Sequence, residues 1–138
     1  MNYALIGYPL GHSMSPFIHK NLFSLAKAEG NYNLLEIPSE RLRREEFSGL
    51  DGFNVTIPYK IDVISLLDSL EGIAKQINSV NTVTRVGEKL VGYNTDYDGM
   101  LYSLKSANIE LKGKIVLCGA GGVARMMAHA KAPFFIYV

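Results

Sequence analysis

Gly92-Tyr93-Asn94-Thr95-Asp96-Tyr97-Asp98-Gly99 is the stretch around which this 138-residue chain is organised. Thr95 and Asp98, three residues apart, form a capping box and predict that a helix begins here. Asp96 would then lie in the first helical turn, at a hinge between two lobes, where clefts commonly form. Taken alone, Asp96 has a simpler interpretation as a first-turn carboxylate that the helix dipole favours.

Before this stretch, strand-like and helix-like patterns alternate up to about residue 79, which predicts an α/β unit with a mixed sheet. Predicted strands cover 3–7, 32–37 and 53–56, and 80–85 with 89–91 form a predicted β-hairpin. Helices are predicted over 39–47 and after 57–60, the latter carrying Ile61, Ile64 and Leu67 on one face.

A further helix is predicted after the loop at 9–16. Ser15-Pro16 has the pattern of an N-cap followed by proline at the first helical position. Ile18, Leu22, Leu25 and Ala26 mark one apolar face, and Gly30 is expected to end the helix.

After the stretch at 92–99, a helix is predicted to end near Asn108, followed by an apolar strand at 114–118. Gly119-Ala120-Gly121-Gly122-Val123-Ala124 then opens a helix with room for about 122–131, and 134–138 reads as a second strand. Strand, Gly-x-Gly-x-x-Ala and helix in that order indicate a dinucleotide-binding turn, whose glycines let a pyrophosphate approach the helix N-terminus. An ordinary left-handed turn between strand and helix is the alternative.

Composition narrows the function classes. The formal net charge of +1 gives no reason to expect nucleic acid or an anionic membrane as a partner. The single cysteine, Cys118, excludes an intramolecular disulfide, and three histidines argue against a zinc cluster, so we assign no metal. No signal-type or membrane-spanning segment is visible, and we expect a cytoplasmic protein.

Three sets of polar residues fall at predicted strand ends or helix starts, where an α/β sheet places its ligands. These are Ser13 with Ser15, Thr56 with Lys60, and Asn81 with Asn94 and Asp96. A lysine and an aspartate brought together could shuttle a proton while a cofactor moves hydride. Each residue alone also has an ordinary structural explanation, such as a helix cap, a solvated lysine or a turn.

Five motifs carry a resemblance that covers the chain from residue 3 to about 127. They are Gly-Tyr-Pro-Leu-Gly-His-Ser-Met-Ser-Pro at 7–16 with His19 and Asn21, Asn-Val-Thr-Ile-Pro-Tyr-Lys at 54–60, Ser-Val-Asn-Thr-Val at 79–83, Gly-Tyr-Asn-Thr-Asp-Tyr-Asp-Gly at 92–99 and Gly-Ala-Gly-Gly at 119–122. In this order they closely resemble the shikimate dehydrogenase family. The resemblance implies NADP-dependent interconversion of 3-dehydroshikimate and shikimate, on the route to chorismate and the aromatic amino acids.

The resemblance also implies roles for the polar residues. Ser13 and Ser15 would hold the substrate carboxylate, and Lys60 and Asp96 would form the catalytic pair, with Lys60 moving the proton and Asp96 orienting substrate and lysine. Ring hydroxyls would be bound by Thr56, Asn81 and Asn94, and the cofactor by Gly119, Ala120, Gly121, Gly122, Val123 and Ala124. Asn78 stands where the family usually has glycine.

By the same resemblance, residues 1–98 form a three-layer shikimate-binding lobe, and 99–138 form part of a Rossmann-type NADP-binding lobe: linker helix, strand, glycine loop, helix and strand. The residue that reads the adenosine ribose would fall about 20 positions after the first glycine, past Val138. Two strands and one helix cannot bury both faces of a parallel sheet, so we expect exposed apolar surface over 114–138. Self-association (for example as a homodimer), a swapped arrangement or a poorly ordered tail would follow from it.

Two alternatives stay open at this point. The chain could prefer quinate, although serine at both 13 and 15 looks more like the shikimate enzymes. It could also be a non-catalytic module that keeps the carboxylate-and-hydroxyl pocket without hydride transfer.

Overall fold

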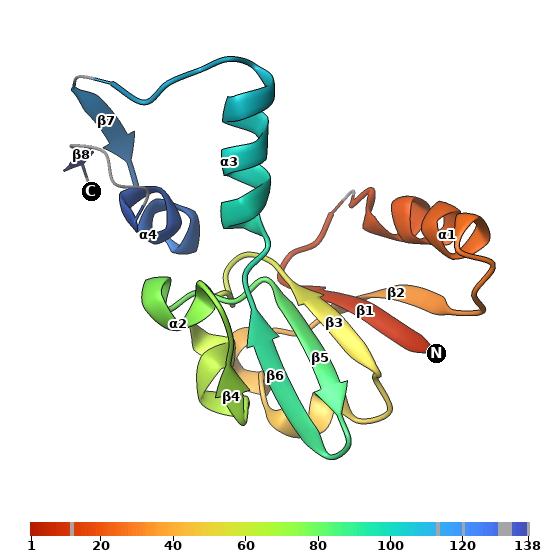
Figure 1. Cartoon of the computed structure of the whole chain (residues 1–138). Helices are drawn as coiled ribbons and strands as arrows, with labels where there is room; N and C mark the ends of the chain where they lie inside the picture. Colours follow the sequence, from red (N-terminus) through yellow and green to blue (C-terminus); the bar gives the residue numbers. More distant parts are fainter. Residues whose placement is uncertain (12, 113, 120, 130–133, 138) are drawn as a thin grey trace.

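The computed structural model describes residues 1–11, 13–112, 114–119, 121–129 and 134–137. A six-stranded mixed sheet forms its larger part (Figure 1). Its strands, in the spatial order β2-β1-β3-β5-β6-β4, are β1 Asn2–Gly7, β2 Asn31–Glu36, β3 Gly52–Val55, β4 Ser69–Leu70, β5 Thr82–Val86 and β6 Lys89–Tyr93. β1 is parallel to β2 and β3, β4 is parallel to β6, and β5 is antiparallel to β3 and β6. The predicted mixed sheet and the predicted hairpin are confirmed.

Helical segments cover both faces of this sheet, which gives three layers. Helix α1, Ser15–Leu25, lies over one face (Figure 1). The short helix α2 and three 3-10 turns cover the other, and they span Ala74–Ile77, Ser39–Arg41, Arg44–Phe47 and Asp62–Leu66. Asn78, which ends α2, has a φ of 52° in the left-handed region. Asparagine tolerates this conformation better than most residues do, which explains how it replaces the glycine that the resemblance leads one to expect.

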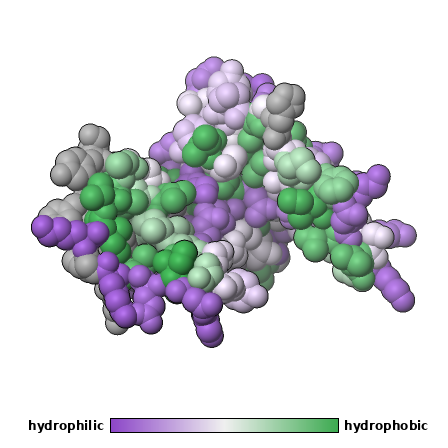
Figure 2. Space-filling view, turned by 90° about the horizontal axis from the view of Figure 1, so that it is seen from above, coloured by the Kyte–Doolittle hydropathy of each residue, from purple (hydrophilic) through white to green (hydrophobic). Residues whose placement is uncertain are grey.

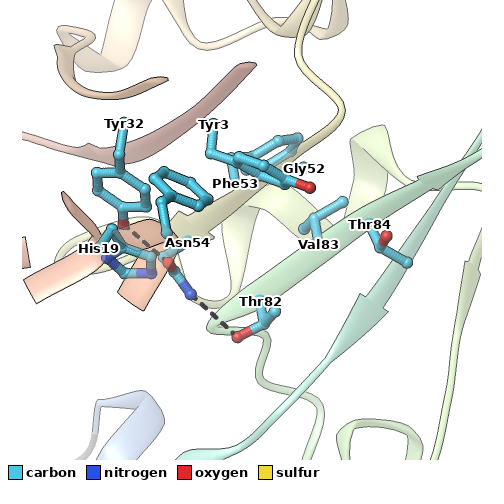
Figure 3. A pocket seen from close by; sticks show the side chains of 10 residues that line it. Tyr3, His19, Tyr32, Gly52, Phe53, Asn54, Thr82, Val83 and Thr84 are labelled. Carbon is cyan, nitrogen blue, oxygen red and sulfur yellow. Dashed lines mark hydrogen bonds between the residues drawn. The ribbon is translucent and has the colours of Figure 1, made fainter. Parts of the chain in front are cut away.

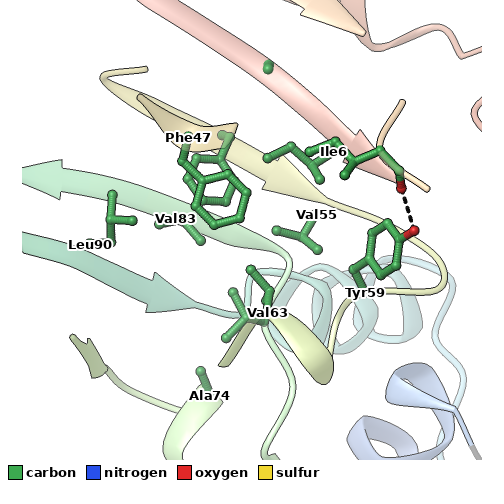
Figure 4. Packing of buried hydrophobic residues seen from close by; sticks show 12 residues of the cluster. Ile6, Phe47, Val55, Tyr59, Val63, Ala74, Val83 and Leu90 are labelled. Carbon is green, nitrogen blue, oxygen red and sulfur yellow. Dashed lines mark hydrogen bonds between the residues drawn. The ribbon is translucent and has the colours of Figure 1, made fainter. Parts of the chain in front are cut away.

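The hydrophobic core lies on the face that carries the 3-10 turns (Figure 4). Alternate residues of neighbouring strands point into it, and the register places Ala4 beside Phe53 and Phe53 beside Val83. Phe47 is fully buried, and its ring centroid lies 4.5 Å from that of Phe53. Buried Tyr59 donates its hydroxyl to the Ile37 carbonyl, so that its polar end is also satisfied.

The predicted helices over 39–47 and after 57–60 are wrong in type, because only 3-10 turns form there. Leu42 and Arg43 have extended backbones between the first two turns. This break lets Phe47 reach the core, and its burial outweighs the weak helix preference of a polar segment.

Helix α1 is confirmed, but its ends and its inner face differ from the prediction. Met14 is the N-cap rather than Ser15, and the helix ends at Leu25 because Lys27 takes a left-handed φ of 51° well before Gly30. The predicted apolar face is exposed, Leu25 by 81%. The helix instead contacts the sheet through aromatic rings: His19 stacks on Tyr32 at 3.7 Å, and Phe23 stacks on Tyr3 at 5.8 Å.

Beyond β6 the chain leaves the sheet through helix α3, Asp96–Ser106, and reaches β7 Ile115–Cys118, helix α4 Gly122–His129 and β8 Phe134–Tyr137. β7 and β8 pair in parallel as a second sheet, which confirms the predicted order of strand, glycine turn, helix and strand. The predicted extension of the helix to 131 falls on residues outside the described part. α4 packs next to α2 and α3 (Figure 1), with the Tyr97 and His129 rings 5.9 Å apart.

Apolar surface is exposed at two places, one over β7 and α4 and one over α1, with hydrophilic surface between them (Figure 2). Val116 and Val123 are more than half exposed in the first area, as the sequence predicts for this part of the chain. No helix within the described residues has the length and apolar content that a membrane crossing requires.

Candidate active site

The start of α3 is held by an asparagine rather than by a capping box. Thr95 is the N-cap, but its side chain makes no capping hydrogen bond. Buried Asn94 caps the helix instead, because its Oδ1 accepts hydrogen bonds from the backbone N–H groups of Asp96 at 3.0 Å and Tyr97 at 3.3 Å. Its Nδ2 donates to the Ser79 carbonyl at 3.1 Å. Asn94 therefore fixes the first turn of α3, and Asp96 with it, to the segment before β5.

Asn81 holds the preceding residue of the same loop. Its Oδ1 accepts from the Thr95 N–H at 2.9 Å, and its Nδ2 donates to Thr95 Oγ1 at 3.0 Å. The Asn81 backbone joins two strands, since its N–H donates to the Tyr93 carbonyl and its carbonyl accepts from Val55. Both asparagines that the resemblance assigns to ring hydroxyls thus also build the loop that carries Asp96.

Lys60 and Asp96, the predicted pair, are brought together. Lys60 Nζ donates to Asp96 Oδ2 at 2.6 Å, and the two side chains are 15% and 35% exposed. The Lys60 carbonyl accepts from the Val80 N–H at 2.7 Å, which fixes its backbone against the segment before β5. A short charge-assisted hydrogen bond in a partly buried place is strong and holds the ammonium in a defined direction.

Ser13, Ser15 and Thr56 line one cavity of about 290 Å³, together with Leu5, Pro9, Leu10 and Ile57. Ser13 Oγ accepts from the Ser15 N–H at 3.2 Å, close to the N-terminus of α1. Hydroxyls beside a helix N-terminus suit a carboxylate. The loop is tied down by Glu36, whose carboxylate accepts from the Leu10 N–H at 2.6 Å. The role of Glu36 was not predicted, because that bond joins two segments 26 residues apart in the chain.

A second cavity, of about 450 Å³, brings the glycine loop to Lys60. Ile57, Pro58, Lys60 and Ile61 line one side, and the other is lined by Leu117, Cys118, Gly119, Gly121, Gly122, Val123 and Ala124. Ile57 lines both cavities, so the two adjoin. The predicted cofactor-binding residues are therefore brought to the predicted catalytic lysine, except for Ala120, which lies outside the described residues.

The glycine loop has room for a phosphate group. Gly119 has a φ of 113°, which residues with a side chain rarely adopt. A Cβ built on Gly121 would meet no atom within 4 Å, so the backbone there is open to a ligand. These features fit the pyrophosphate of a dinucleotide at the N-terminus of α4.

A series of side-chain hydrogen bonds that leads from Tyr32 to Asn81 was not predicted. Tyr32 donates its hydroxyl to Asn54 Oδ1 at 2.8 Å, and Asn54 Nδ2 donates to Thr82 Oγ1 at 3.2 Å (Figure 3). Thr82 Oγ1 in turn donates to Asn81 Oδ1 at 3.0 Å. Burial raises the pKa of Tyr32 to about 12, and the Ser15 hydroxyl acts in the opposite direction. Asn54 and Thr82 face each other across β3 and β5, so a correct strand register would have revealed the contact.

Comparison with known proteins gives one consistent result. Residues 5–83 match the family model described as the shikimate dehydrogenase substrate binding domain. An NADP(+)-dependent shikimate dehydrogenase of Oceanobacillus iheyensis is 43% identical over 135 residues, which cover 91% of this chain and 49% of that protein. One of Bacillus anthracis is 40% identical over 136 residues, which cover 94% and 49%. The chain thus spans about half the length of the curated relatives it matches.

Solved structures agree. The Thermus thermophilus shikimate 5-dehydrogenase in complex with NADP(H) and shikimate has a TM-score of 0.86 at 34% identity, covering 99% of this chain and 55% of that one. Shikimate dehydrogenase from Aquifex aeolicus also has a TM-score of 0.86, at 40% identity, covering 99% and 54%.

Proposed function

This chain belongs to the shikimate dehydrogenase family, and from that membership we propose that it serves the NADP-dependent, reversible reduction of 3-dehydroshikimate to shikimate. The observation that carries the proposal is the 2.6 Å contact between Lys60 and Asp96, with Lys60 lining the cavity of the glycine loop. The neighbouring cavity with Ser13, Ser15 and Thr56 has the hydroxyl donors that a carboxylated polyol needs. The Thermus thermophilus relative, which was solved with shikimate and NADP(H), supports this choice of ligands.

We propose that the two units of the chain divide the work. Residues 1–98 would hold the substrate, because they include both members of the pair, with Asp96 in the first turn of α3, and all the hydroxyls of the serine cavity. Residues 99–138 would supply part of the cofactor lobe, through the separate β7–β8 sheet and Gly119, Gly121, Gly122, Val123 and Ala124. Ser13 and Ser15 would hold the carboxylate, and Thr56, Asn81 and Asn94 would contact ring hydroxyls.

Lys60 would act as the proton carrier. A bound NADPH supplies hydride to a carbonyl carbon and, as NADP, takes it back. During reduction Lys60 would donate a proton from Nζ to the carbonyl oxygen, and it would take the proton back in the reverse direction. Asp96 would orient the ammonium through Oδ2, so that one of its hydrogens points to the substrate rather than to solvent.

The test measures the reduction of NADP in the presence of saturating shikimate. The absorbance of NADPH is recorded over time for the wild-type chain and for Lys60→Ala. We expect turnover in the wild type and a loss of about 10²- to 10⁴-fold in the variant, as for other general acid–base residues. Lys75→Ala is the matched control, since Lys75 pairs with Glu71 at 3.0 Å on the exposed surface. It should leave turnover unchanged.

Binding of shikimate by calorimetry separates the alternatives. If the chain binds shikimate but does not turn it over, it is a non-catalytic binding module. If it shows neither binding nor turnover, the proposal is overturned. Faster turnover of quinate than of shikimate would show that the chain resembles the quinate-preferring relatives in its substrate preference.

We also propose that copies of the chain associate through the exposed apolar surface of β7 and α4. Exposed Val116 and Val123 support this, because apolar side chains next to an open sheet edge favour pairing. Sedimentation of Val116→Lys beside wild type tests it: wild type should be dimeric or larger, and the variant monomeric. A monomeric wild type contradicts it.

A further inference from the structure

Ser79 is an unusual buried residue. Its side chain is fully buried, yet among the described residues its Oγ has no hydrogen-bond partner. An unpaired buried hydroxyl costs stability, and most such groups in proteins are paired. The position of Ser79 therefore calls for an explanation from its surroundings.

Those surroundings include Gly122, the first residue of α4. A Cβ built on Gly122 would lie 2.6 Å from Ser79 Oγ and 3.2 Å from Lys60 Cβ, and the first distance is shorter than real Cβ contacts. Gly121, the residue before it, has no atom within 4 Å of such a Cβ. Gly122 is also not one of the spaced positions of Gly-x-Gly-x-x-Ala, which are 119, 121 and 124. The dinucleotide motif thus leaves this glycine unexplained, whereas close contact with Ser79 and Lys60 accounts for it.

The Ser79 segment also connects to both members of the proposed catalytic pair. Its carbonyl accepts from Asn94 Nδ2 at 3.1 Å, and Asn94 caps the helix that carries Asp96. The N–H of the next residue, Val80, donates to the Lys60 carbonyl at 2.7 Å. One short segment therefore touches the backbone of Lys60, the cap of α3 and the start of α4.

We propose that Gly122 and Ser79 are positioning residues, whose direct contact sets the distance between the glycine loop and the Lys60–Asp96 pair. The role rests on the proposed function, since it presumes a cofactor on that loop. The close approach of α4 needs glycine at 122, because a methyl group there would lie 2.6 Å from Ser79 Oγ and must displace either the helix or that hydroxyl. In a dehydrogenase such a shift would move the bound cofactor away from the proton carrier.

Exchanging the sizes of the two residues tests the contact. Gly122→Ala should raise the rate of amide hydrogen exchange in α4 about tenfold, because the added methyl group overpacks and weakens the contact of the helix with Ser79. Adding Ser79→Ala to that variant removes the Oγ that the new methyl meets, and it should return exchange to within about twofold of wild type. Gly99→Ala in α3 is the matched control, because its Cβ would meet no atom within 4 Å, and it should not alter exchange in α4.

NADP and shikimate binding by calorimetry give the functional readout. Gly122→Ala should weaken NADP binding about tenfold while leaving shikimate binding unchanged, and the double variant should recover NADP binding. A purely structural role would weaken both ligands alike. Unchanged α4 exchange in Gly122→Ala, or no recovery in the double variant, overturns the positioning role. A wild-type chain that binds no NADP would overturn the proposed cofactor instead, and the exchange result would still decide whether the contact exists.

Discussion

Lys60 Nζ and Asp96 Oδ2 lie 2.6 Å apart although 36 positions separate the two residues in the chain. One residue comes from the loop after β3 and the other from the first turn of α3. Their backbones are held by neighbouring residues of one segment, because Val80 bonds to Lys60 and Ser79 bonds to the cap of α3. The contact therefore depends on three loops folding correctly, and it is a sensitive point for mutation.

Asp96→Asn should remove the negative charge that faces the Lys60 ammonium while keeping the shape of the side chain. We expect shikimate-dependent turnover to fall by about 10²-fold or more, because the ammonium of Lys60 loses its orienting partner. Asp98→Asn, an exposed carboxylate in the same helical turn, is the control and should keep its turnover. Equal rates in wild type and Asp96→Asn would contradict an orienting role.

Asn94→Ala should destabilise the fold by about 1–3 kcal/mol, because two N–H groups of α3 and the Ser79 carbonyl lose their partner. Urea denaturation measures the free energy of unfolding. Asn21→Ala removes an exposed amide whose one bond within the described residues is to the Phe17 carbonyl of its own helix, and it should change stability by less than about 0.5 kcal/mol. A loss no larger than that of the control would disprove the capping role.

The burial of Tyr32 leads us to expect that the free energy of unfolding falls at alkaline pH. The pKa of Tyr32 rises from 10.0 to about 12 on folding, so the unfolded chain releases the phenol proton first as pH rises. The stability that is present below pH 10.0 should therefore decline between pH 10.0 and about 12. Tyr32→Phe should flatten this decline in pH-dependent urea unfolding, whereas Tyr102→Phe should not, since Tyr102 is 73% exposed. Identical slopes in the two variants would refute the assignment to Tyr32.

Phe47→Ala should cost about 3–5 kcal/mol, because it leaves a cavity beside Phe53 in the centre of the core. Phe17→Ala on α1 is the matched change at a residue that is 63% exposed, and it should cost far less. Thermal unfolding of the two variants makes the comparison. Similar losses would mean that the surface of α1 is covered in solution.

Much of the fold could be predicted, since alternating apolar strands, turn glycines and strand-end polar residues are local signals. The predictions failed where distant contacts decide local structure. Phe47 is buried in the core, and 3-10 turns form around it where a helix was predicted. In α1, Phe23 and His19 contact the sheet in place of the predicted apolar face. Neither outcome is visible in local periodicity.

The candidate site shows the same division. Lys60 and Asp96 were predicted as partners from motif and position, and the structure brings them within hydrogen-bond distance. The capping role of Asn94 could not be predicted, because a Thr-x-x-Asp pattern competed with it and only the loop geometry decides which side chain reaches the free N–H groups. The roles of the pair in a reaction remain predictions.

The core cluster draws its described residues from Ala4 to Leu90, and the six-stranded sheet is complete at Tyr93. Every strand of this sheet therefore precedes α4 in the chain, so the sheet can form without α4. Until the β5–β6 hairpin emerges, β3 lacks its antiparallel neighbour, and the nascent chain exposes Phe53 and Val55. The surface that Gly122 contacts, formed by Ser79 and Lys60, thus belongs to a unit that can fold before α4 docks onto it.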